Sequence, residues 1–408
     1  MHLSNGCAGQ INRSTGRARH ELGEIFRAHI DAFRERHILS PEQAGVVRAI
    51  CACRTAQLGG HLDLCLDCGF ERPAYNSCRN RHCPKCQALD QHRWLERRLE
   101  RILPVAYFHV VFTLPSELAS VGLRNRRLVY ELLFRAAAST LLTLGKDPKR
   151  LGALLGLTMV LHTWTRDLRF HPHVHAIVTG GGLSFDGQRW ISTGRKYLFA
   201  VQLLGRLFRG KFLHHLARAH KEGRLDLPRS LTADGAFEAL LRDLYDKDWV
   251  VYAKRPFAGP KQVFSYLGRY THRVALSNHR ILDVTEQSIT LATRHRKTVT
   301  LSPEELIRRF LLHVLPRRFV KIRHYGLMAS ANVHSRLERA RALLEPTDNA
   351  TQAETSHPVP IESETTGKLI QRLTGMDPAI CPACQGSRLQ RFPLDTPTHA
   401  RPPPAAAA

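Results

Sequence analysis

The chain has 408 residues, 43% of them hydrophobic, which is enough for two or three domains with a buried core. Its net charge of +25 excludes an acidic or neutral surface and favours a partner rich in phosphate, either nucleic acid or an acidic membrane. No apolar run reaches the roughly 18 residues that span a bilayer, and no signal core follows the N-terminus. We therefore expect a soluble cytosolic protein whose clustered cysteines bind metal rather than form disulfides.

The composition changes along the chain in a way that predicts five segments. Apolar residues recur with helical spacing after His20, a cysteine-rich stretch without long apolar runs follows, and the end of the chain is polar and then rich in Pro and Ala. The expected segments are a loose arm (1–18), a helical lead-in (19–60), a zinc-binding module (61–90), a large catalytic domain (91–335) and a mostly disordered tail (336–408).

The cysteine module contains two CxxC pairs, which suit a tetrahedral thiolate site. Little apolar sequence could otherwise stabilise the segment, so bound zinc is favoured over reduced buried thiols. The preferred ligands are Cys65, Cys68, Cys83 and Cys86, with Cys78, His82 and His61 as alternatives. The interleaved cations Arg79, Arg81 and Lys85 are expected to contact DNA backbone.

Four other cysteines receive different interpretations. Cys51 and Cys53 end an apolar helix and are expected to belong to the core. Cys381-Pro382-Ala383-Cys384 is half a zinc site, which a pair elsewhere in the chain or in another subunit could complete, or which has no ordered role.

Regular elements are predicted throughout the large domain. Stretches rich in β-branched and aromatic residues predict strands, and Ser302-Pro303-Glu304-Glu305 is a capping box that opens a helix. The predicted strands are 105–114, 157–165, 170–179, 249–253, a hairpin over 280–293, and 297–301, with helices over 115–144 and 196–245 and a helix after Pro260.

A histidine cluster follows from strand geometry. Residues two apart on a strand share a face, so His173 and His175 present two imidazoles side by side, as a divalent metal requires. A two-residue turn at Asp167-Leu168 would place His162 opposite His173 as a third ligand. His171 is an alternative ligand or a DNA contact, and His109 is expected to be a satisfied, partly buried side chain.

A tyrosine pair lies about ninety residues further on. Residues four apart on a helix are neighbours, so Tyr266 and Tyr270 would present two hydroxyls on one face. The alternative is that both rings belong to an amphipathic core. The cations expected to hold a phosphate and lower the phenol pKa are Lys254, Arg255, Arg269 and Arg273.

These motifs resemble the HUH endonuclease superfamily and, within it, the rolling-circle insertion-sequence transposases of the insertion-sequence ninety-one type and the related common-region elements. His173-Val174-His175 resembles the histidine motif of that superfamily, and Tyr266-Leu267-Gly268-Arg269-Tyr270 resembles the two-tyrosine motif of those transposases. The similar stretches occur in the same order over about residues 20–335: CRTAQLGGH, YNSCRNRHCPKCQ, HTWTRDLRFHPHVH, YLGRYTHRVALSN and RFVKIRHYG.

The resemblance implies an α+β fold in which an antiparallel HUH nuclease sheet with flanking helices follows a small helical segment and a zinc-ribbon-like module. It implies a bacterial, cytoplasmic, nucleoid-associated transposase with structural Zn and catalytic Mg or Mn. Tyr266 or Tyr270 would cut single-stranded DNA at element ends through a 5′-phosphotyrosine link and rejoin it to target DNA, with no nucleotide cofactor and no membrane partner. The alternatives are a replication initiator or relaxase, and a zinc-dependent DNA-binding regulator without catalysis.

Overall fold

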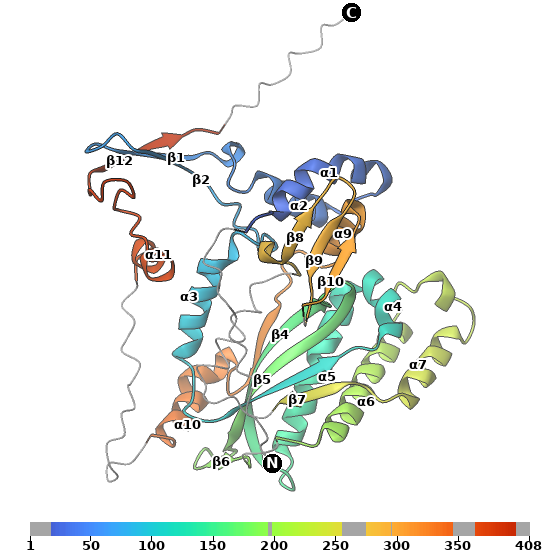
Figure 1. Ribbon diagram of the computed structural model, residues 1–408. Coiled ribbons are helices and arrows are strands. Elements are labelled where there is room, and N and C mark those ends of the chain that lie inside the picture. Colours follow the sequence, from blue (N-terminus) through green and yellow to red (C-terminus); the bar gives the residue numbers. More distant parts are fainter. Residues whose placement is uncertain (1–17, 195–197, 255–274, 295, 346–363, 397–408) are drawn as a thin grey trace, which may run out of the picture.

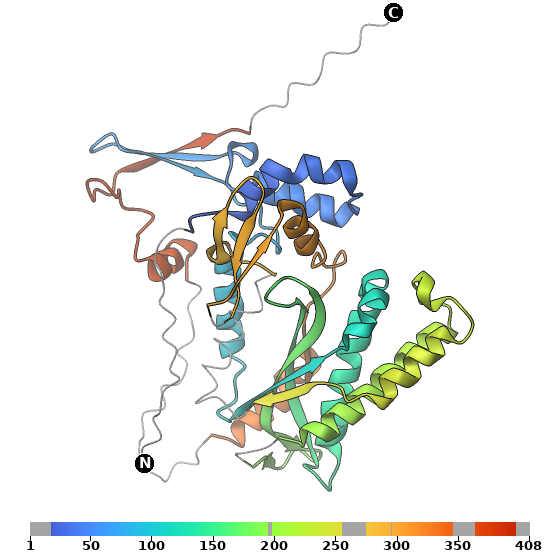
Figure 2. The same cartoon turned by 45° about the vertical axis from the view of Figure 1, so that its right-hand side comes forward.

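The computed structural model describes residues 18–194, 198–254, 275–294, 296–345 and 364–396 of the chain. Within these ranges the strands form three antiparallel sheets with flanking helices (Figures 1 and 2). This arrangement confirms the α+β fold expected from the sequence.

The N-terminal helices pack against an element from much later in the chain. Helix α1 (Leu22–Arg36) and helix α2 (Pro41–Ala52) share a hydrophobic core with α9 (Pro303–Leu311), where Phe26 meets Phe310 edge-on at a ring-centroid distance of 5.5 Å. A small sheet of order β10-β9-β8 contributes to the same core. Its strands are β8 (Ile281–Val284), β9 (Ile289–Ala292) and β10 (Thr298–Leu301).

Two of these helices begin where capping signals predict. Ser40 Oγ accepts a hydrogen bond from the Gln43 N–H at the start of α2, and Ser302 Oγ accepts one from the Glu305 N–H at the start of α9. Each hydroxyl satisfies an amide that has no partner within its helix.

The cysteine-rich segment forms a second sheet with the C-terminal part of the chain. Strand β1 (Gly60–Cys65) pairs on one side with β2 (Glu71–Tyr75) and on the other with β12 (Leu389–Leu394), and helix α3 (Gln87–Leu99) follows. Figure 1 shows β12 in red beside β1 and β2 in blue. The predicted tail is therefore wrong for residues 364–396, where α11 (Thr366–Thr374) and β12 are ordered by partners that a local composition argument does not detect.

The large sheet has strand order β11-β4-β5-β3-β7, with β6 paired to β5. Its strands are β3 (Tyr107–Thr113), β4 (Ala153–Trp164), β5 (Phe170–Ser184), β6 (Trp190–Ser192), β7 (Val251–Lys254) and β11 (Ile322–Gly326). Strand β5 is central, between β4 and β3. Strand β4 is buried along almost its whole length, which explains its continuous apolar sequence.

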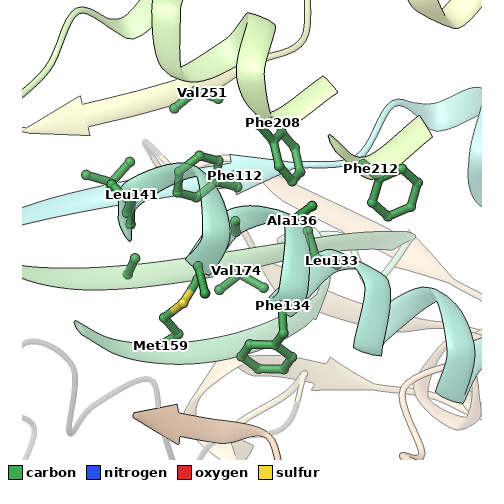
Figure 3. Close-up of a cluster of buried hydrophobic side chains, with 14 of the residues drawn as sticks. Phe112, Leu133, Phe134, Ala136, Leu141, Met159, Val174, Phe208, Phe212 and Val251 are labelled. Carbon is green, nitrogen blue, oxygen red and sulfur yellow. The ribbon is translucent and has the colours of Figure 1, made fainter. Parts of the chain in front are cut away.

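Helices cover one face of this sheet. They are α4 (Ala119–Arg124), α5 (Arg126–Lys146), α6 (Val201–Lys221) and α7 (Ala236–Asp246). Figure 3 shows Phe112, Met159 and Val174 of the sheet packed against side chains of α5 and α6. Helix α5 is long and apolar enough to cross a membrane by length and composition, but 67% of the relevant window is buried in this core.

The remaining elements are short. The helix expected over 115–144 is divided at Asn125, whose backbone leaves the helical region, into α4 and α5. Helix α10 (Glu338–Ala342) follows β11. Single-turn helices cover Ala56–Leu58, Ser116–Leu118, Arg229–Leu231, Asn278–Arg280, Ser330–Asn332 and Val333–Leu337.

Candidate functional site

Three histidines meet on the face of the large sheet opposite α5 and α6. His162 lies on β4, and His173 and His175 lie on β5, with one ring nitrogen of each within 4.8 Å of the others. The ring centroids of His162 and His175 are 4.4 Å apart, and those of His173 and His175 are 5.0 Å apart. The structure thus brings together the three imidazoles expected to form a metal site.

Strand alternation explains why the histidines are separated from the core. Val174 and Leu161 are paired across β5 and β4 and face the helices, whereas His173 and His162 are paired one residue further along and face the other way. The pairing of His162 with His173 is the one predicted.

The turn that produces this register differs from the predicted two-residue turn. Thr165 N–H donates to the Arg169 carbonyl, so three residues form the loop, and Leu168 has a positive φ of 64°. A register shift between His162 and Trp164 then restores the pairing of His162 with His173. Leu168 is buried, and its carbonyl lies 3.0 Å from His313 Nε2, which holds the turn in place.

Neighbouring groups orient each ring. His173 Nδ1 lies 2.7 Å from the His171 carbonyl, so this nitrogen carries the proton and Nε2 keeps a free lone pair. His175 Nδ1 lies 2.8 Å from His109 Nε2, and the two rings stack with an interplanar angle of 8°. His162 stacks on Trp164 at 4.6 Å. His109, expected to be a satisfied buried side chain, is therefore a direct support of the cluster.

Burial keeps the imidazoles of His173, His175 and His109 neutral. Burial lowers the pKa of His173 to about 4. Burial, with His162 and His173 close by, lowers the pKa of His175 well below its usual value. Burial and the adjacent Lys254 lower the pKa of His109 to about 4. Neutral imidazole is the form that binds a metal, so the donor set fits a divalent cation at neutral pH.

Lys254 lies beside this cluster. It ends β7, is exposed, and pairs with His109 across β3, which places it on the histidine face of the sheet. The other predicted phosphate ligands, Arg255, Arg269 and Arg273, and the predicted nucleophiles Tyr266 and Tyr270 lie outside the described residues.

The described residues on both sides of that stretch approach the cluster. On one side, Lys254 neighbours His109. On the other, Ala275 shares a core with Leu168 of the β4–β5 turn, and Arg280 donates to the carbonyls of Ala275 and Arg166. The chain before residue 255 therefore lies beside β3, which carries His109, and the chain after residue 274 contacts the β4–β5 turn.

The cysteines form two groups of four. Cys53, Cys78, Cys83 and Cys86 have sulfur atoms within 4.8 Å of one another, and so do Cys65, Cys68, Cys381 and Cys384. The predicted single site of Cys65, Cys68, Cys83 and Cys86 does not match this arrangement, because each CxxC pair meets cysteines that are distant from it in sequence. Cys53, predicted to be core, belongs to the first group, since the end of α2 delivers it to the Cys83–Cys86 turn.

Of the alternative ligands, Cys78 joins the first cysteine group, whereas His82 and His61 have other contacts, as do two of the three predicted DNA contacts. His82 Nε2 accepts a hydrogen bond from the Leu315 N–H, and His61 lies near Asp63, so neither joins a cysteine group. Arg81 donates to the Phe319 carbonyl, and Lys85 forms a mostly buried ion pair with Glu21 at 2.5 Å. Among the three predicted cations, Arg79 is exposed.

The sequence interpretation missed the ligand position of Cys53 and the support from His109. For Cys53, the available signal was the motif CRTAQLGGH, which begins at this residue. His109 had no such signal, because its contact with His175 depends on the pairing of β3 with β5.

Comparisons with known proteins agree with this geometry. Residues 25–114 match the family described as the IS91 transposase zinc-binding domain, and residues 156–336 match the family described as "Putative transposase". A protein of Sinorhizobium fredii (strain NBRC 101917 / NGR234) named "Putative transposase y4qJ" is 45% identical over 383 residues, which are 90% of this chain and 94% of that protein. The transposase for insertion sequence element IS801 of Pseudomonas savastanoi pv. phaseolicola is 28% identical over 305 residues, 70% of each chain.

Proposed function

Because the chain belongs to the IS91 family of transposases, and thus acts on DNA, we propose that it cleaves and rejoins single-stranded DNA at element ends by a metal-dependent tyrosine mechanism. The observation that carries this proposal is the group of three converging imidazoles on the sheet face opposite α5 and α6, near the exposed Lys254. Neutral imidazoles that converge in this way are the usual ligands of a divalent cation, and such a cation can act on a phosphodiester.

His162, His173 and His175 would hold a divalent cation, which supplies Lewis acidity to a phosphate oxygen. Their donor atoms fit this role, because one ring nitrogen of each lies within 4.8 Å of the others, and the His171 carbonyl leaves Nε2 of His173 for the metal. Imidazole ligands favour manganese over magnesium, so manganese is the better ion for assays.

Tyr266 or Tyr270 would act as the nucleophile. Its phenol oxygen attacks the phosphorus and loses its proton, the bond to the 3′ oxygen breaks, and that oxygen leaves as a 3′-hydroxyl after gaining a proton. The 5′ phosphate remains bonded to the tyrosine, and the second tyrosine would serve the second cleavage or the transfer to target DNA. The energy of the broken bond is kept in the covalent link, so no nucleotide cofactor is needed.

Cations around the site would position the DNA strand. Lys254 is exposed on the histidine face, and Arg255, Arg269 and Arg273 lie in the same segment as the tyrosines. Positive charge beside a phenol lowers its pKa and favours the attacking phenolate. The residue before this segment, Lys254, pairs with His109, and the residue after it, Ala275, shares a core with Leu168 of the β4–β5 turn, which supports the assignment.

The zinc-binding domain would recognise the DNA. The cysteine groups support structural zinc, and Arg79 is exposed next to Cys78 of the first group. We place the protein in the bacterial cytoplasm, associated with the nucleoid, because its substrate is the genome and its charge is +25.

The test is covalent adduct formation with a labelled single-stranded element end and Mn²⁺. The parent protein should form an adduct that survives denaturation, and Tyr266→Phe/Tyr270→Phe should form none. His173→Ala/His175→Ala should also form none while it keeps DNA binding. The matched control is Tyr252→Phe, which removes an exposed phenol on β7 and should leave the adduct unchanged.

Two results would overturn the proposal. Equal adduct from the parent and the double tyrosine variant would show that the nucleophile is another residue. DNA binding by the parent without any cleavage would instead favour a zinc-dependent regulator in which the histidines are structural.

A further inference from the structure

We propose that Cys65 and Cys68 bind a second structural zinc ion together with Cys381 and Cys384, so that the C-terminal segment closes the N-terminal zinc module within the same chain. The matched zinc-binding family covers residues 25–114, so it includes Cys65 and Cys68 but not Cys381 and Cys384. Cys65 and Cys384, whose sulfur atoms are neighbours in space, are 319 positions apart in the sequence.

The sulfur positions fit a tetrahedral thiolate site. Cys65 Sγ lies 3.6 Å from Cys384 Sγ, and Cys68 Sγ lies 3.8 Å from Cys381 Sγ. Four thiolates around one zinc ion, with Zn–S bonds of about 2.3 Å, stand about 3.8 Å apart. A disulfide requires about 2.05 Å, so these four cysteines are free thiols in a metal-binding arrangement.

The two CxxC turns have the same backbone structure. In the first, the Cys65 N–H donates to the Phe70 carbonyl and the Gly69 N–H donates to the Cys65 carbonyl. In the second, the Cys381 N–H donates to the Gly386 carbonyl and the Gln385 N–H donates to the Cys381 carbonyl, at the same sequence offsets.

The residue after the second cysteine has a positive φ in both turns, 71° for Gly69 and 62° for Gln385. Gln385 has a backbone conformation that residues other than glycine rarely adopt, which indicates a specific structural requirement at this turn. Two matching turns facing each other form the usual frame of a zinc ribbon.

The surrounding contacts bring the second turn to the first. Strand β12 pairs with β1 from Cys65↔Leu389 to Gly60↔Leu394, directly after the second CxxC turn. Asp63 of β1 is buried and accepts hydrogen bonds from Arg391 at 2.7 Å and from Arg72 at 2.9 Å. A Cβ on Gly386 would collide with the Asp67 carboxylate, so glycine allows the two turns to approach.

Helix α11 attaches the same segment to α3. Arg372 pairs with Glu96 at 2.6 Å, and Arg93 donates to Thr366 Oγ1 at 2.6 Å. Besides the cysteines, two contacts therefore hold the segment 364–396 in place: the pairing of β12 with β1 and the bonds between α11 and α3. Such preorganisation lowers the entropy that the metal must overcome to join distant parts of the chain.

The test measures zinc bound to the purified full-length protein, by metal analysis and by the charge-transfer absorption of the Co²⁺-substituted form. Because the three histidines can also take a divalent ion, only thiolate-bound ions are counted: the parent should bind two per chain, Cys381→Ser/Cys384→Ser one, and Cys83→Ser/Cys86→Ser one. Cys51→Ser is the matched control, because Cys51 lies outside both groups, and it should bind two. One ion in the parent, or two in Cys381→Ser/Cys384→Ser, would overturn the proposal.

Two further measurements keep the test independent of folding defects and of the cleavage chemistry. The unaltered protein loaded with ¹¹³Cd should give two tetrathiolate resonances, and a single one would contradict the second site. Mixing Cys65→Ser/Cys68→Ser protein with Cys381→Ser/Cys384→Ser protein should not increase bound zinc, whereas an increase would show that the site forms between subunits instead. None of these readouts depends on the tyrosines or on DNA.

Discussion

His109 Nε2 lies 2.8 Å from His175 Nδ1, with the two rings stacked at a centroid distance of 5.0 Å. The two residues lie diagonally across β3 and β5, since His109 pairs with Ile177, two residues beyond His175. This contact restrains the rotation of the His175 ring, which lies 4.4 Å from His162 and 5.0 Å from His173 between ring centroids. A residue outside the metal group thereby determines the geometry of the group.

Replacing His109 should weaken the metal site without removing a ligand. We expect His109→Phe to lower Mn²⁺ affinity by about 10- to 100-fold, the usual cost of losing such a support, with the fold retained. Titration calorimetry with Mn²⁺ measures the affinity. His334→Ala is the control, because that side chain is 88% exposed. Unchanged Mn²⁺ affinity in His109→Phe would show that His175 is oriented by other contacts.

Lys254 should contribute to DNA binding through its charge. If it contacts one phosphate, Lys254→Ala should reduce the salt slope of single-stranded DNA binding by about 0.7 and slow cleavage. Lys149→Ala, at an exposed lysine after α5, should leave both unchanged. Fluorescence anisotropy at several salt concentrations gives the slope. Equal slopes for the parent and Lys254→Ala would remove Lys254 from the DNA path.

Acid should destabilise the fold through histidines that are buried as neutral rings. Burial lowers the pKa of His313 and of His324 to about 4, below the value of about 6.5 in an unfolded chain. Between these values the unfolded chain binds more protons, so stability falls as the pH falls from about 6.5 toward 4, by up to about 3 kcal/mol for each histidine.

This pH dependence can be assigned to one residue. In urea unfolding at pH 7 and pH 5, His313→Asn should lose less stability on acidification than the parent, because it has no imidazole to protonate. The Asn amide occupies the place of His313 Nδ1, which contacts Thr163 Oγ1, and it loses the contact of Nε2 with the Leu168 carbonyl. An identical loss in both proteins would exclude His313 as a source of acid sensitivity.

Asp63 should hold the C-terminal strand on the zinc module. Burial opposes its ionisation, but hydrogen bonds from Arg391 and Arg72 lower its pKa overall. Asp63→Asn should cost about 1–3 kcal/mol and increase amide hydrogen exchange in Leu389–Leu394. Asp31→Asn, at an exposed site on α1, is the control. Unchanged exchange in β12 would show that strand pairing alone holds the segment.

Some features of the protein follow from the sequence because they depend on local spacing. Two imidazoles two residues apart on a strand must share a face, so the pairing of His173 and His175 is determined by the sequence of β5 alone. The short loop between β4 and β5 similarly brings His162 opposite His173. The charge, strands β3, β4, β5 and β7, the capping signals and the family resemblance belong to this class, whereas β6 and β11 were not predicted.

Other features depend on contacts between distant parts of the chain. Cys53 joins Cys78, Cys83 and Cys86 only because α2 ends beside that turn, and Cys65 and Cys68 meet Cys381 and Cys384 only because β12 pairs with β1. His109 reaches His175 only through the pairing of β3 with β5. A CxxC pair indicates that the chain can bind a metal. It does not indicate which other two cysteines complete the tetrahedral site. The tertiary structure decided the partners, because thiolates and imidazoles are assigned to a site by distance in space and not by distance along the chain.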